Sequence, residues 1–206
     1  QPMGFYSPQS LIQDARRHGV TVLPVNVNES GCEARCVDSS TIRVGLNLVR
    51  GLGKDAALRV EEAAPFADIA DLSRRADLSV EHVVALARAG ALDCFGVTRR
   101  QALWQAGVAA TEREGMLPGL SSVVAPSLPG MNPFELMAAD VAATGVTPGL
   151  MPVEMVRSAL SAQGVVPASE LLHGVEDGTR VRVAGVITHR QHPATAGGVT
   201  FLGMED

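Results

Sequence analysis

The sequence predicts a mainly α-helical protein of the α+β class, and three observations lead to that prediction. Apolar residues recur at helical spacing along most of the chain, and several of these stretches follow a capping residue. Glycine-containing turns at 50–54 and 88–92 separate pairs of helical stretches. Strand-like alternation is confined to short stretches within 20–46 and 179–204. With 206 residues and 46% hydrophobic content, the chain can bury one good core or two small ones.

Capping, proline and glycine residues mark the ends of the first expected helix and strand. Ser7 is placed to cap a first helix, a proline occupies its first position, and Gly19 ends it. A short apolar strand follows at 20–23 and stops at a proline. Residues 33–37 and 41–46 alternate around Asp-Ser-Ser, which predicts a β-hairpin. A helix is expected to begin soon after it and to lead into Gly51.

Residues 49–60, VRGLGKDAALRV, have the pattern of a helix-hairpin-helix motif. Two glycines flank one apolar residue, which permits a tight turn with positive φ and a close approach of backbone to a surface. The amides of the turn and of the following helix start would face a phosphate, and Lys54, the only lysine of the chain, stands there. An ordinary turn between two helices is the alternative. The predicted DNA-contacting residues are Arg50, Gly51, Leu52, Gly53 and Lys54.

Helices are expected next at 54–63, at 68–75 and from 80 to 89, the last two capped by an aspartate and a serine. The third helix runs into RAGAL, which resembles a second hairpin with one glycine kept. Ala89, Gly90 and Ala91 are therefore predicted as a second DNA contact, because such units often pack in pairs. A capping box at Thr98 opens a helix whose Trp104 is interpreted as a core anchor rather than a base-stacking residue.

Residues 111–131 are rich in proline, glycine and serine and are interpreted as a linker or an ordered surface crossing. Beyond them, Asn132 and Glu135 can form a capping box around a helix that runs to about Ala143. Prolines then mark the starts of two further helices, one from 152 to about 164 and a shorter one at 167.

The last part of the chain changes to strand patterns. Residues 179–189 and 199–204 resemble the two arms of a hairpin, and a glycine inside the first arm suits a strand that curls into a small barrel. Two strands do not close a barrel, so the expectation is that the chain ends inside an OB-fold. Its basic residues Arg180, Arg182 and Arg190 are the predicted contacts for single-stranded nucleic acid, with a solvated exterior as the alternative.

Charge and composition narrow the function classes. The net charge of −5 excludes a protein that coats nucleic acid by bulk attraction. The first 113 residues carry 13 basic and 13 acidic side chains, and the remainder carries 4 and 9, so phosphate contacts belong to the N-terminal part or to the arginines near the end. No apolar run reaches membrane length, and no signal peptide or disulfide spacing is present, which predicts a cytoplasmic protein without membrane contact.

Catalytic and metal-binding chemistry are not indicated. Cys32 and Cys36 have no second pair and no nearby histidine, so they are interpreted as packing or surface residues rather than zinc ligands. The five histidines lack a recognisable nucleophile or carboxylate arrangement. We therefore expect no catalytic residue, no bound metal and no cofactor in this chain.

Several ordered motifs together resemble the C-terminal region of bacterial C-family DNA polymerases. They are GFYSP, LPVNVN, IRVGLNLVRGLG, LARAGALDCFG, RRQALWQ, LPGMNPFELMAADVAATGVTPG and VRVAGVITHRQHPATAGGVTFLGMED. The resemblance covers essentially the whole chain. The RQALWQ and HRQHPATA motifs are more similar to the error-prone, damage-inducible branch, which acts in translesion synthesis and DNA repair, than to the replicative polymerase III alpha subunits. Residues 148–154 depart from the usual pattern of the family.

The resemblance implies a domain map. Residues 1–44 would end the fingers domain, 45–110 would form the tandem helix-hairpin-helix, and 111–131 would be the linker. Residues 132–177 would form a helical connector, and 178–206 a truncated OB-fold. The palm, whose aspartates hold two magnesium ions for nucleotidyl transfer, is absent, so this chain alone is expected to be inactive.

The partners implied are duplex and single-stranded DNA and, by resemblance, the sliding clamp and mutasome proteins. Two other classes of protein also fit the pattern. One is a DNA-binding accessory region of a nuclease or ligase, since these enzymes use the same modules. The other is a protein-interaction module, although no clear clamp-binding peptide is present.

Overall fold

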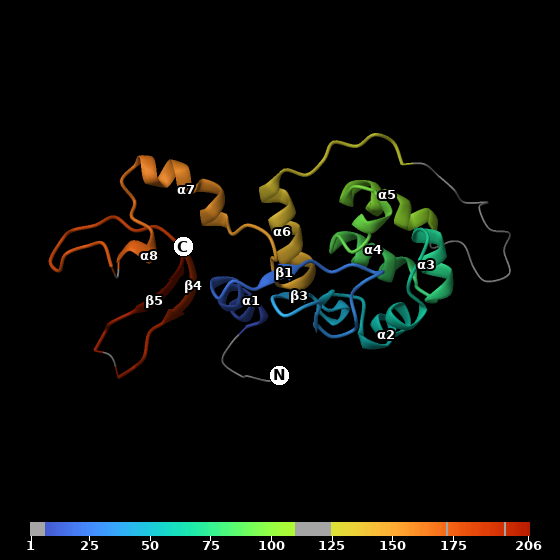
Figure 1. The fold of residues 1–206 in the computed structure, drawn as a ribbon, viewed down its shortest axis with the longest axis horizontal. Helices are drawn as coiled ribbons and strands as arrows, with labels where there is room; N and C mark the ends of the chain where they lie inside the picture. Colours follow the sequence, from blue (N-terminus) through green and yellow to red (C-terminus); the bar gives the residue numbers. More distant parts are fainter. Residues whose placement is uncertain (1–6, 110–124, 172, 196) are drawn as a thin grey trace. The chain divides into compact units, whose positions relative to one another are not determined.

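The computed structural model describes residues 7–109, 125–171, 173–195 and 197–206. The chain divides into two compact units, Gln1–Gly149 and Leu150–Asp206. The elements of the first unit, drawn from blue to yellow in Figure 1, are α1 (Pro8–Arg17), β1 (Thr21–Leu23), β2 (Arg35–Cys36), β3 (Thr41–Arg43), the 3-10 turn η1 (Leu46–Leu48), α2 (Lys54–Ala63), α3 (Ile69–Arg75), α4 (Val80–Arg88), the 3-10 turn η2 (Asp93–Phe95), α5 (Arg99–Ala109) and α6 (Pro133–Thr144). The second unit contains α7 (Pro152–Ala162), α8 (Ala168–Leu171), β4 (Val186–Gln191) and β5 (Phe201–Glu205).

The helices begin where capping chemistry places their ends. Ser7 accepts a hydrogen bond from the Ser10 amide, and Asp68 accepts one from the Asp71 amide at 2.8 Å. Asn132 and Glu135 bond each other's backbone amides, both at 2.9 Å. These reciprocal bonds satisfy amides that have no partner inside the helix. The predicted helices are confirmed within one or two residues at each of these sites.

A three-stranded sheet precedes the first hairpin, with strand order β1-β3-β2. The predicted hairpin is present, because β2 and β3 pair antiparallel with Cys36 opposite Ile42, although both strands are shorter than expected. β1 pairs parallel with β3, which places Val22 beside Ile42. Ile12, Val22, Val44 and Val146 form a small buried cluster beside this sheet.

The main core of the first unit lies between the helices. It contains five leucines that are at most 2% exposed and that come from η1, the first hairpin, α3, α4 and the segment after the second hairpin: Leu46, Leu52, Leu72, Leu86 and Leu92. Burial of a leucine contributes about 2 kcal/mol of hydrophobic stabilisation. Helices α4 and α5 pack together, and α6 packs beside α4 (Figure 1).

Two expectations for this unit are wrong. The segment leading into Gly51 is only the 3-10 turn η1, because the Leu46 and Asn47 amides are bonded to the carbonyls of Gly31 and Cys32 and five residues remain before the turn. Trp104 is not a core anchor, since it is 42% exposed. The face of α5 that packs inward carries Ala102 and Ala106, and a residue two positions from Ala102 faces the other way.

In the second unit, β4 and β5 form an antiparallel ribbon with an irregular register between Ile187 and His189. The hairpin is confirmed, but its first arm is shorter than predicted. Before Val186 the described backbone pairs only at Arg182, which bridges Val165. No closed barrel is formed by the described residues, and the strands expose Ile187 and Phe201 by 55% and 56%. The predicted linker lies mostly at 110–124, outside the described residues.

Candidate nucleic-acid interface

The first hairpin is a tight turn anchored in the core. Gly51 and Gly53 have φ values of 87° and 75°, a region that residues with a Cβ rarely occupy. Leu52 between them is 2% exposed and packs into the main core. Leu52 therefore anchors the hairpin in the core, while both glycines remain at the surface.

The exposed side of this hairpin presents backbone donors. α2 begins at Lys54, and its N-cap, Gly53, offers no side chain to accept from the first-turn amides. Amides in the first turn of a helix have no intrahelical partner, and the helix dipole adds partial positive charge there. A Cβ on Gly53 would meet no atom within 4 Å, so the approach is open. This arrangement can bind an anion such as a phosphate.

Lys54 adds a full charge at the same place. Its side chain is exposed and makes no ion pair with any residue that the structure describes. Asp55 lies next to it in the first turn and offsets part of that charge. Of the predicted residues, Gly51, Gly53 and Lys54 thus lie exposed at one point, whereas Leu52 is buried beneath them.

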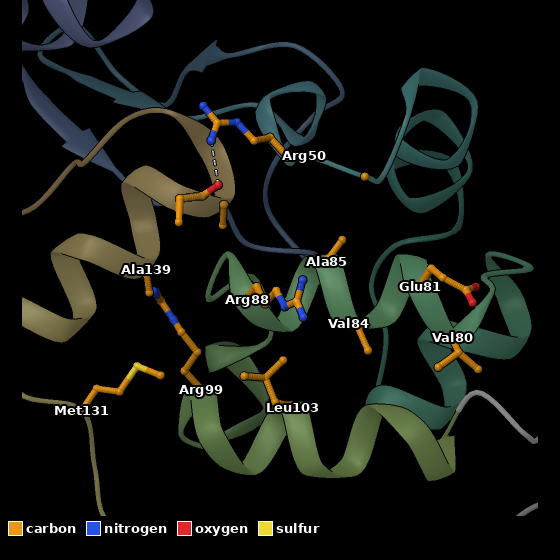
Figure 2. A pocket seen from close by; sticks show the side chains of 13 residues that line it. Arg50, Val80, Glu81, Val84, Ala85, Arg88, Arg99, Leu103, Met131 and Ala139 are labelled. Carbon is orange, nitrogen blue, oxygen red and sulfur yellow. Dashed lines mark hydrogen bonds between the residues drawn. The ribbon is translucent and has the colours of Figure 1, made fainter.

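Arg50 is directed elsewhere. Its guanidinium donates to the Ala142 carbonyl at 2.9 Å, and its amide donates to the Ala143 carbonyl at 2.8 Å. Both acceptors are in the last turn of α6, whose carbonyls lack intrahelical partners. Figure 2 shows the guanidinium turned toward α6, with this hydrogen bond dashed. Arg50 therefore fastens α6 to the hairpin in this structure.

The second hairpin is buried, unlike the first. Ala89 and Ala91 are 3% and 0% exposed, and Gly90 between them is buried with a φ of 73°. The Ala91 amide donates to the Leu86 carbonyl, and the Ala91 carbonyl accepts from the Val27 amide, both at 3.0 Å. Its backbone groups are used within the protein. The prediction that Ala89, Gly90 and Ala91 contact DNA has no support from this placement.

An ion pair between buried Arg99 and partly exposed Asp140 covers that hairpin. Arg99, 8% exposed, lies directly over Gly90 and binds Asp140 at 2.8 Å (Nη2 to Oδ1). Burial raises the pKa of Asp140, and the neighbouring guanidinium opposes this effect only in part. Arg99 also donates to the Leu136 carbonyl of α6. Sequence spacing gave no signal for this pair, because its members are 41 positions apart.

A pocket of about 710 Å³ lies beside the first hairpin, between α4, α5 and α6 (Figure 2). Its walls are mainly apolar, and its charged lining residues are Arg50, Glu81, Arg88 and Arg99. Gly51 lies at its edge. Sequence reasoning did not single out Arg88, which the structure places here.

The predicted basic residues of the second unit are not aligned on one strand. Arg180 lies before β4 and belongs to no strand. Arg182 forms the isolated bridge with Val165, and its guanidinium donates to the Gln163 carbonyl at 3.3 Å. Arg190 is exposed on β4 opposite Leu202. The expected alternation of Arg180 and Arg182 along a barrel strand is therefore not observed.

The described ranges also bear on metal sites, disulfides and membrane spans. They contain no group of three or more His, Cys, Asp or Glu side chains arranged to hold a metal ion. Cys32 is buried, whereas Cys36 and Cys94 are exposed, and none of the three forms a disulfide. No helix in these ranges is long and apolar enough to cross a membrane.

Known proteins are similar to this chain. A family model described as the helix-hairpin-helix motif matches residues 19–102, which confirms the motif predicted from residues 49–60. A protein named error-prone DNA polymerase from Corynebacterium efficiens is 66% identical over 206 residues, as is one of the same name from Corynebacterium glutamicum. Each alignment covers 100% of this chain and 19% of the relative. A third, from Mycobacterium tuberculosis, is 56% identical over 212 residues, with the same coverage. The chain spans about a fifth of the length of these curated relatives.

Proposed function

Since this chain is homologous over its whole length to one segment of bacterial error-prone DNA polymerases, we propose that it is a DNA-binding segment of such an enzyme. The first hairpin is the proposed contact with the duplex backbone. The observation that carries the proposal is the exposed turn at Gly51 to Lys54, where open helix-start amides and an unpaired lysine meet. Its support from the comparisons is the helix-hairpin-helix match.

The proposed contact does not read sequence. Backbone amides and a lysine contact phosphate oxygens, which are alike at every base pair. Such contacts fix the position of the protein on the duplex and give a salt-dependent affinity. Arg50 is left out of the contact, because it is bonded to α6.

Salt titration of labelled duplex binding by the 206-residue chain tests this proposal. Log affinity should fall linearly with log salt concentration, by about 0.9 per phosphate contacted, for unrelated duplex sequences alike. Gly53→Ala should lower affinity for all of them by about tenfold or more, the equivalent of one lost charge-assisted hydrogen bond. An absence of salt dependence, or an affinity of Gly53→Ala equal to wild type, would overturn the proposal.

Gly19→Ala is the matched control for that substitution. Gly19 has a φ of 80°, and a Cβ there would also meet nothing within 4 Å. Both substitutions therefore place alanine at a positive φ in open space. Gly53 also has a ψ of 158°, a backbone region used almost only by glycine, so its alanine costs about 1–3 kcal/mol of stability, and affinity is compared on folded protein. Only the one at Gly53 should change DNA affinity.

For the second unit, we propose that β4 and β5 belong to an OB-fold that binds single-stranded template through Arg190. The exposed apolar side chains on the ribbon support the fold, because they need a cover. Arg190 stands exposed on β4 in support of the contact. Photocrosslinking of a single strand to the complete polymerase tests this, and labelling that never reaches residues 186–191 would refute it.

The rest of the enzyme remains outside this segment. The described residues contain no group of three or more His, Cys, Asp or Glu side chains that could hold a metal ion, and we propose no nucleotidyl-transfer step for them. Translesion synthesis is proposed for the complete protein. The comparisons favour a polymerase over a nuclease or ligase accessory region. Contacts with the sliding clamp and mutasome proteins stay a prediction from the resemblance.

A further inference from the structure

Arg88 is the one arginine lining the pocket that has no partner among the described residues. It is the last residue of α4 and is exposed. It makes no hydrogen bond or ion pair with any residue in the described part of the chain. The other two arginines of the pocket are engaged, Arg50 with the Ala142 carbonyl and Arg99 with Asp140. Figure 2 shows the Arg88 side chain among the residues that line the pocket.

Packing places Arg88 close to the proposed phosphate contact. A Cβ built on Gly51 would lie 3.7 Å from the Cβ of Ala85 in α4. Arg88 follows Ala85 by three positions, so the two share a helix face with Cβ atoms about 5–6 Å apart. The sum of these two distances places the Arg88 Cβ within about 10 Å of the Gly51 position in the hairpin. Three nucleotides of one DNA strand advance by about the same length along the duplex axis.

The surroundings of Arg88 favour an anion. Glu81, the acidic residue of the pocket lining, lies two helical turns earlier on α4. The apolar walls nearby, including Val84 and Leu103, reduce solvent screening of the guanidinium. A guanidinium presents paired donors that match two oxygens of one phosphate.

We propose that Arg88 is a second phosphate-binding residue, which contacts the duplex backbone a few nucleotides from the first hairpin and sets the angle at which α4 meets the DNA. This proposal rests on the proposed function. It assigns the second DNA contact to Arg88, the residue before the buried second hairpin, instead of to that hairpin itself. Two contacts on different helices fix an orientation that one hairpin alone leaves free.

Arg88→Gln tests the proposal against Arg17→Gln as a matched control. Arg17 is also the last residue of its helix, is exposed and has no partner among the described residues, so both changes remove the same helix-end charge. In salt titrations of duplex binding by the 206-residue chain, Arg88→Gln should weaken binding about fivefold or more and lower the slope by about 0.9. Arg17→Gln should leave both unchanged.

A second measurement does not depend on the stability of the variant. In the wild-type chain, the NMR signal of the Arg88 Nε–H group should shift on addition of duplex, and that of Arg17 should not. Equal binding by the two variants together with an unmoved Arg88 signal would overturn the proposal. If wild type binds duplex with a salt dependence in that experiment, the proposed function stands while the role of Arg88 fails. If wild type shows no salt-dependent binding, both fail.

Discussion

Gly90→Ala is the substitution for which the structure gives the sharpest expectation. Gly90 has a φ of 73°, and a Cβ there would overlap Arg99 Nη2 and lie 3.0 Å from its Cζ. The guanidinium cannot swing away freely, because it is bonded to Asp140 and to the Leu136 carbonyl of α6. The alanine must therefore displace a partly buried ion pair as well as adopt a left-handed backbone.

The cost follows from these two parts. Left-handed backbone in alanine costs about 1 kcal/mol. Displacing this partly buried ion pair costs about 2 kcal/mol, since a charge-assisted hydrogen bond is lost while both charged groups stay in place. Gly96→Ala is the matched control, because Gly96 has a φ of 70° and a Cβ there would meet nothing within 4 Å. We expect a loss of about 3 kcal/mol for Gly90→Ala and about 1 kcal/mol for the control.

Denaturant unfolding followed by far-UV circular dichroism measures both losses. The two variants are compared with wild type at equal m-value, so that the midpoint reports stability. In an Asp140→Asn background the pair is already broken, and the extra cost of Gly90→Ala should shrink toward that of the control. Equal losses for Gly90→Ala and Gly96→Ala in the wild-type background would refute this account of how α6 is held on the second hairpin.

Three further expectations follow from the described residues. Burial disfavours the charge of Asp71, but the Ala67 amide and two arginines outweigh it and hold the pKa of Asp71 below its usual value. Its contribution is therefore present above the unfolded pKa and lost as pH falls through the folded one, so Asp71→Asn should cost about 1 kcal/mol at pH 7 and almost nothing in strong acid. Thermal unfolding at both pH values checks this, and an equal loss at both would contradict it. Iodoacetamide should label exposed Cys36 before buried Cys32, since burial also raises the pKa of the Cys32 thiol and the thiolate is the reactive form; mass spectrometry that finds Cys32 labelled first would contradict this. In hydrogen exchange, the exposed ribbon of β4 and β5 should exchange fast; exchange across residues 186–191 as slow as in α4 would count against it.

Features encoded within a few residues were predictable from the sequence. The N-caps Asp68 and Ser79 and the capping boxes at Thr98 and Asn132 lie three positions from the groups that they bind. The hairpin at Gly51 was predictable for the same reason, because its positive φ values depend on its own two glycines. Local chemistry alone decides these structures.

Features that join distant segments were not predictable. The parallel pairing of β1 with β3 and the bond from Arg50 to Ala142, 92 positions away, leave no local pattern. The second hairpin resembles the first in sequence, yet Arg99 and α6 bury it. A repeated sequence motif therefore predicts where a turn forms, but it does not predict whether that turn is exposed to solvent.

Amide NMR of the ¹⁵N-labelled chain with and without duplex DNA tests the central claim most directly, because it reports the two hairpins in one experiment. The account predicts that amide signals from Gly53 to Ala56 shift on addition of duplex of any sequence and return as salt is raised. It predicts that the Gly90 and Ala91 signals stay in place, since both amides are bonded inside the protein. Shifts centred on Gly90 and Ala91, with none at Gly53 to Ala56, would contradict it.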